Sequence, residues 1–167
     1  MKSRNDINLL TKAGLAFGGA ILSVIVFFKI YTLTHIAEWD KNSEPLKPEW
    51  QALLAPYFPD LDLTTNIYVH VDKIPFNLSA RILNYNDRIL LGPDYKLHYS
   101  SDLSFFTITV HELVHSEQWK KWGILSDPIY LLTGFLDHEQ RPWEIEAREK
   151  TNLVMLDLTK KRLIGLI

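Results

Sequence analysis

Cysteine is absent from this chain of 167 residues. Its absence excludes disulfide bonds, thiolate ligands to a metal ion and a cysteine nucleophile, and it leaves the redox compartment open. The chain also lacks a large excess of either charge. Its formal net charge is −2, which gives no electrostatic basis for binding nucleic acid. Any metal ion must therefore be held by histidine and carboxylate side chains.

Internal repeats and low-complexity tracts are also missing from the sequence, which is 47% hydrophobic and 23% charged. That composition is typical of a globular protein, and the length suffices for one domain with an appendage. Alternating apolar residues predict a strand over residues 66–72. Two further apolar runs, 80–85 and 88–91, predict a hairpin whose tip is Asn86–Asp87.

Helical patterns accompany these strands, so we expect an α+β fold. A short helix is predicted over residues 49–54. A long one is predicted over 103–122, with an N-cap from residues 100–102 and a stop at Gly123. A second long helix begins at Pro142, which is suited to a first turn, and runs to about residue 161.

An apolar run over residues 13–33 is interrupted only by Lys29. As a helix it extends about 30 Å, which is the thickness of the hydrocarbon layer of a bilayer. Lys29 can extend its ammonium group to the headgroups, and Tyr31 is suited to the interfacial aromatic belt. We therefore expect a single transmembrane anchor that contacts membrane lipid. A cleaved signal peptide and a buried core helix are the alternatives.

The orientation of this anchor follows from the basic residues of the polar tail, residues 1–12. They are Lys2, Arg4 and Lys12. The positive-inside rule predicts that this tail is cytoplasmic and that the rest of the chain is extracytoplasmic. Residues 34–48 are expected to form a linker, and residues 49–167 the folded domain.

Residues 111–115 are His-Glu-Leu-Val-His, an HExxH pattern. On a helix, His111 and His115 lie one turn apart on the same face, where two imidazoles can bind one Zn²⁺ ion. Glu112 can reach a water molecule beside the metal and act as a general base. From the composition, we expect roughly 0.01 chance matches to the pattern in a chain of this length. The pattern therefore predicts a zinc site.

A third protein ligand is expected downstream, in the first turns of the predicted helix after Pro142. Glu144 and Glu146 lie about 200° apart around a helix, so they cannot both face the metal. Glu144, Glu146 and His138 are the candidates for this ligand. His138 would be the ligand in a zincin that uses three histidines, although the HExxHxxGxxH pattern is absent.

HELVH at 111–115, followed by Trp143-Glu144-Ile145-Glu146-Ala147, resembles the gluzincin metallopeptidases, and most of all the small HExxH domains called minigluzincins. The run from 80 to 92 resembles the strand pair that precedes their active-site helix. The resemblance implies a small zincin-like domain with a short mixed sheet, an HExxH helix and a glutamate helix.

Residue roles follow from the same resemblance. It makes His111, His115 and Glu144 the zinc ligands and Glu112 the general base. It also assigns a substrate-binding edge strand, formed by Ile89, Leu90, Leu91 and Gly92. Arg148 is a departure, because gluzincins commonly have at this position an acid that orients a ligand histidine. Glu146 or a backbone carbonyl is then the expected partner.

The sequence therefore predicts a membrane-anchored zinc metalloendopeptidase that acts on a protein or peptide substrate. His138, Tyr130 and Arg141 are candidate donors to the oxyanion that forms during hydrolysis. A peptidoglycan endopeptidase is one alternative. Another is a catalytically degenerate zinc protein that serves as a binding or membrane-assembly factor.

Overall fold

The computed structural model of the chain describes residues 4–74, 82–85, 87–126, 129–130, 133 and 136–163. Its centre is a small mixed sheet of four strands, which are β1 (Ser43–Pro45), β2 (Ile67–His70), β3 (Ile82–Tyr85) and β4 (Arg88–Leu91). The order across the sheet is β1-β2-β4-β3. β2 and β4 are parallel, and β1 and β3 pair antiparallel with β2 and β4, respectively.

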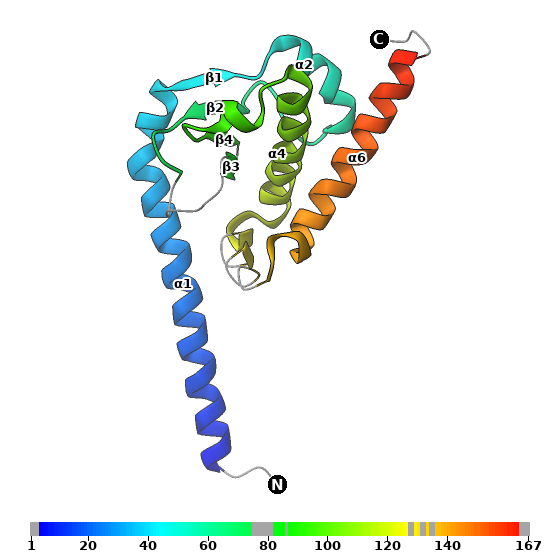
Figure 1. Cartoon of the computed structure of the whole chain (residues 1–167). Coiled ribbons are helices and arrows are strands. Elements are labelled where there is room, and N and C mark those ends of the chain that lie inside the picture. The colour runs from blue at the N-terminus through cyan, green and yellow to red at the C-terminus, as the bar shows by residue number, and fades with distance from the viewer. Residues whose placement is uncertain are drawn as a thin grey trace.

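Three long helices surround or leave this sheet (Figure 1): α1 (Arg4–Lys41), α4 (Asp102–Trp122) and α6 (Pro142–Leu163). α4 and α6 pack against each other, and α1 extends away from the domain toward the N-terminus. The short helical segments are α2 (Pro48–Leu54), η1 (Ala55–Tyr57), α3 (Tyr95–His98), η3 (Gly123–Leu125) and η4 (His138–Gln140).

The ends of α4 are fixed as the sequence predicts. The side chain of Ser101 accepts a hydrogen bond from the backbone N–H of Ser104 at 3.1 Å, and the Ser104 hydroxyl completes a capping box. At the other end Gly123 has a φ of 54°, a conformation that glycine adopts without steric cost. These signals confirm the predicted helix over residues 103–122.

Each face of the sheet contributes to a different cluster of buried side chains. Tyr68, Ile89 and Leu91 pack with Val110 and Leu113 of α4. The opposite face holds Val69 and Leu90, which pack with residues of the α1 end of the chain. The alternation of side chains along β2 therefore has its predicted period, but both faces are covered.

Ile89, Leu90 and Leu91 lie in β4, which has a partner strand on each side, and Gly92 follows the strand. The prediction of an edge strand at these residues is therefore wrong. It failed because β2 pairs with the outer side of the predicted hairpin and makes β4 internal. Among the described strands, β3 and β1 form the edges of the sheet.

The linker predicted at residues 34–48 is also wrong in part. α1 continues as a helix to Lys41, and after one residue the chain enters β1. Trp39 is 5% exposed, and its ring lies 6.0 Å from that of Tyr85 in an edge-on arrangement. Arg88 pairs with Asp40 at 2.8 Å. The last turns of α1 are therefore part of the folded domain.

Candidate metal centre

Two helices supply the side chains of the predicted metal site. His111 and His115 lie one turn apart on α4, with their Nε2 atoms 3.2 Å apart. Glu144 lies in the first turn of α6, and its Oε2 is 3.2 Å from His111 Nε2 and 3.6 Å from His115 Nε2. The packing of α4 against α6 thus brings together three residues that are up to 33 positions apart in the sequence.

The size of this triangle fits a small metal ion. Ligand atoms about 2.0–2.1 Å from a tetrahedral ion lie about 3.3 Å from one another. The three separations of 3.2, 3.2 and 3.6 Å agree with that value. His111, His115 and Glu144 could therefore hold a metal ion, and they are the cluster of this kind within the described residues.

The charges of these groups are strongly coupled. Burial tends to raise the pKa of Glu144, but hydrogen bonds to His111 and His115 hold it well below its usual range. Burial likewise tends to lower the pKa of His115, and hydrogen bonding to Glu144 with the charges of Glu112 and Glu144 raises it to about 9. The pair therefore shares a proton that a metal ion must displace.

Gln118 is the residue that supports His115. Its Oε1 lies 2.7 Å from His115 Nδ1, and its Nε2 donates to the carbonyl oxygen of Trp143 at 3.1 Å and to Glu146 Oε2 at 2.9 Å. A carbonyl oxygen can only accept, so the orientation of the amide is fixed. His115 Nδ1 then donates to Gln118, and Nε2 faces the ligand triangle, where it can bind a metal ion that displaces its proton.

Because position 148 is Arg and not an acid, another side chain must orient the ligand histidine, and Gln118 is in contact with His115. Glu146 was expected as a partner of a ligand histidine, but His115 Nδ1 contacts Gln118, and Glu146 accepts a hydrogen bond from the Gln118 amide. Arg148 itself pairs with Glu139 of η4 at 2.7 Å. That ion pair ties η4 to α6 beside the ligand cluster.

The rival ligand His138 lies next to Glu144, not in the triangle. Its Nε2 is 3.2 Å from Glu144 Oε1, whereas His111 and His115 contact the other carboxylate oxygen, Oε2. The His138 side chain is 62% exposed. His138, one of the three predicted oxyanion donors, is therefore in direct contact with the cluster.

Tyr130 and Arg141 lie together near the site. The guanidinium of Arg141 stands 5.7 Å from the centre of the Tyr130 ring. Burial raises the pKa of Tyr130, and the charges of Glu144 and Glu112 add to this effect while Arg141 opposes it. Tyr130 therefore remains a hydrogen-bond donor at neutral pH.

Glu112 is 5% exposed and lies between α4 and β3. Burial raises its pKa, as does the charge of Glu144. The charges of the two histidines and a hydrogen bond from the backbone N–H of Asn84 oppose this rise. The side chain of Asn84 donates to the carbonyl oxygen of Glu112 at 2.9 Å and to the hydroxyl of Ser116 at 2.9 Å. The edge strand β3 is therefore joined to the general-base candidate.

A groove of about 590 Å³ between α4 and α6 leads to His111. Thr107 and Ile108 line one side of it, and Thr151 and Asn152 line the other. Thr151 is 5% exposed, and its hydroxyl oxygen has no hydrogen-bond partner in the part of the chain that the structure describes. The groove therefore opens onto His111, one of the three candidate ligands.

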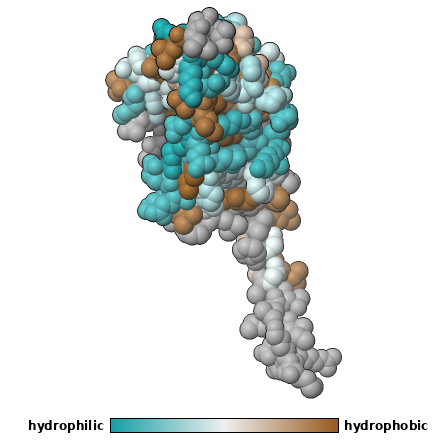
Figure 2. All heavy atoms as spheres, turned by 90° about the vertical axis from the view of Figure 1, so that its right-hand side faces the viewer, coloured by the Kyte–Doolittle hydropathy of each residue, from teal (hydrophilic) through white to brown (hydrophobic). Residues whose placement is uncertain are grey.

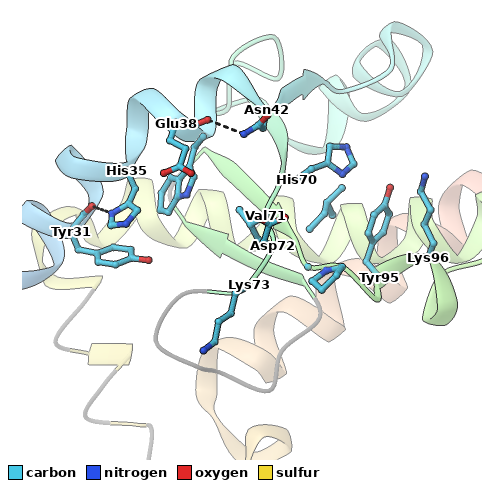
Figure 3. Close-up of a pocket in the computed structure, with 14 residues that line it drawn as sticks. Tyr31, His35, Glu38, Asn42, His70, Val71, Asp72, Lys73, Tyr95 and Lys96 are labelled. Carbon is cyan, nitrogen blue, oxygen red and sulfur yellow. Dashed lines mark hydrogen bonds between the residues drawn. The ribbon is translucent and has the colours of Figure 1, made fainter.

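A larger pocket, of about 760 Å³, lies elsewhere, between the end of α1 and the ends of β2 and β4 (Figure 3). It contains two histidines, but the His35 ring is turned toward Tyr31 and His70 pairs with Glu44 at 3.1 Å. None of the ligand triangle lines it. The larger volume of this pocket does not make it the metal site. The positions of the donor atoms favour the triangle of His111, His115 and Glu144 instead.

Sequence reasoning missed the roles of Gln118 and Asn84. The position of Gln118, three residues after His115 on the same helix face, was a usable signal. Asn84 had no such signal, because its role depends on the packing of β3 against α4. Comparison with known proteins adds no further assignment, since no protein-family model, curated protein or solved structure matches the chain.

Proposed function

We propose that this chain is a membrane-anchored zinc metallopeptidase of the gluzincin type. The observation that carries the proposal is the triangle formed by His111, His115 and Glu144, whose sides of 3.2 to 3.6 Å suit a tetrahedral ion. Two imidazoles and a carboxylate are ligands that zinc accepts readily. A glutamate ligand, with HExxH on the preceding long helix, is the arrangement implied by the family resemblance.

A zinc ion bound here would supply Lewis acidity, which brings the pKa of a water molecule toward about 7 and polarises a carbonyl group. Glu112 would take the proton of the attacking water and pass it to the leaving amine. Its burial suits this role, because a raised pKa brings a carboxylate closer to the working pH. His138 and Tyr130 would donate hydrogen bonds to the oxyanion.

The correction of the sheet order changes the proposed binding site for the peptide. β4 is internal, so it cannot pair with a substrate. β3 is an edge of the described sheet and contacts α4 through Asn84 and Glu112. An extended peptide would add to β3 by main-chain hydrogen bonds. The scissile bond would then lie over the ligand triangle.

Membrane attachment is the second part of the proposal. α1 is long and apolar enough to cross a bilayer. The basic residues before the apolar run favour a cytoplasmic N-terminus and an extracytoplasmic domain. The zinc site would then act on protein or peptide substrates outside the cytoplasm.

The test measures zinc and cleavage separately, with the full chain in detergent micelles. Metal analysis should find about one zinc per chain in the wild type and in Glu146→Ala, and loss of zinc in Glu144→Ala. Loss of zinc in Glu146→Ala alone would overturn the choice of ligand. Glu149→Ala, an exposed position on the same helix, is the matched control.

Cleavage is then measured with a library of unstructured peptides. Glu112→Gln should keep its zinc and lose nearly all activity, because the amide cannot accept the water proton. Unchanged activity in Glu112→Gln would exclude the general-base role. A wild type that binds zinc and cuts no peptide in the library would instead favour a binding protein.

A further inference from the structure

The direction of α1 relative to the domain says which end of the domain faces a membrane. α4 ends, and α6 begins, at the end of the domain that points the same way as the N-terminal half of α1 (Figure 1). The ligand triangle lies toward this end, since His115 is seven residues before the last residue of α4 and Glu144 is in the first turn of α6.

Contacts along α1 show how far this end reaches. Ile25 is 9% exposed, whereas Leu22 and Val26 beside it are 61% and 46% exposed. One face of α1 is therefore buried at Ile25. From Ile25 to Leu33, the expected end of the membrane span, the helix axis runs about 12 Å. The domain therefore reaches at least to the level at which the expected span ends.

The surface at this end has the composition of a membrane interface. Trp122 is 43% exposed and Leu125 is 50% exposed, and the ammonium group of Lys121 stands 5.7 Å from the Trp122 ring. Figure 2 shows apolar surface at the lower end of the domain, close to where α1 leaves it. Tryptophan, leucine and lysine together suit the boundary between headgroups and acyl chains.

Buried contacts fix the orientation of the domain relative to α1. α1 enters the domain through buried Trp39, which packs on Tyr85, and through the ion pair between Asp40 and Arg88. A single residue then separates α1 from β1. The domain therefore cannot turn its apolar end away from a bilayer that α1 crosses.

We propose that the end of the domain formed by Lys121, Trp122 and Leu125 lies in the interfacial layer of the bilayer. The metal site then lies about 10 Å above it, given the rise of α4 between His115 and Trp122. The substrates of such a site are segments of protein that run close to the membrane surface. This inference rests on the proposed membrane anchor, but not on zinc binding or on catalysis.

The absence of cysteine allows a direct test of depth. Single-cysteine variants Leu125→Cys, Leu103→Cys and Leu22→Cys of the full chain are labelled with a nitroxide and placed in vesicles of phosphatidylcholine and phosphatidylglycerol. Collision with oxygen and with a water-soluble nickel chelate is then measured by electron paramagnetic resonance. Leu103 is the matched control, because it is 67% exposed and lies at the other end of α4.

The nickel chelate should reach the label at position 125 several-fold less often than the label at 103, with oxygen showing the reverse. A label at 22 in the hydrocarbon, with 125 as accessible to nickel as 103, would refute the inference and leave the anchor intact. A label at 22 that is freely accessible to nickel would refute both. Far-ultraviolet circular dichroism equal to that of the wild type shows that each variant is folded.

Discussion

The Nδ1 atom of His115 lies 2.7 Å from the Oε1 atom of Gln118. Gln118 is 1% exposed, and the contact is partly buried. The same amide donates to the carbonyl oxygen of Trp143, the residue that precedes Glu144. One side chain on α4 therefore orients a histidine of the ligand triangle and holds the turn of α6 that carries the carboxylate.

We predict that Gln118→Ala lowers zinc affinity about 10- to 100-fold, because His115 loses the acceptor that fixes its ring and α6 loses a buried donor. Competition with a chromophoric chelator measures the affinity. Lys121→Ala, an exposed change on the same helix, should leave it unaltered. Equal affinity in Gln118→Ala and the wild type would rule out the positioning role.

Metal removal should lower thermal stability without unfolding the domain. Glu144 Oε2 lies within ion-pair distance of both histidines, so the buried carboxylate has partners when the metal ion is removed. Free zinc at 100 times its Kd should raise the free energy of unfolding by about 2.7 kcal/mol. Differential scanning fluorimetry with and without a chelator measures the change in Tm, and Glu144→Ala should show none.

Asn84→Ala should destabilise the fold by about 1–3 kcal/mol, because the carbonyl oxygen of Glu112 and the hydroxyl of Ser116 lose a buried donor. Urea unfolding followed by circular dichroism measures this. Asn152→Ala is the control, since Asn152 is exposed on α6. Equal midpoints for the two variants would contradict the assigned role of Asn84.

Trp39→Ala tests whether α1 belongs to the domain. Trp39 is 5% exposed and packs on Tyr85, so its truncation should cost about 3–5 kcal/mol of stability. Leu33→Ala on the same helix is the comparison, because Leu33 is 72% exposed. A domain that depended only on residues 49–167 would unfold at the same denaturant concentration in both variants.

The sequence predicted those parts of the fold that local signals determine. Ser101 and Gly123 mark the ends of α4, and helical spacing brings His111 and His115 to one face. A carboxylate ligand was expected in the first turns of a helix that begins at Pro142, and the family resemblance pointed to Glu144. These features depend on neighbours within a few residues.

The order of the strands depends on distant pairing instead. β2 pairs with β4 across 21 residues, and this made an internal strand of the segment expected at the edge. The charged residues and prolines after the apolar run suggested a linker. Trp39 has buried partners only because Tyr85 and Val69 arrive from elsewhere in the chain. Such contacts leave no periodic pattern in the local sequence.

Asn42 is the single residue between α1 and β1. A domain on a long flexible tether samples a wide range of heights above its membrane, whereas this junction has no slack to extend. A peptide bond would have to arrive at one fixed height to meet the ligand triangle. The distance of that peptide bond from the bilayer would then be a first criterion of substrate selection, before any side chain is recognised.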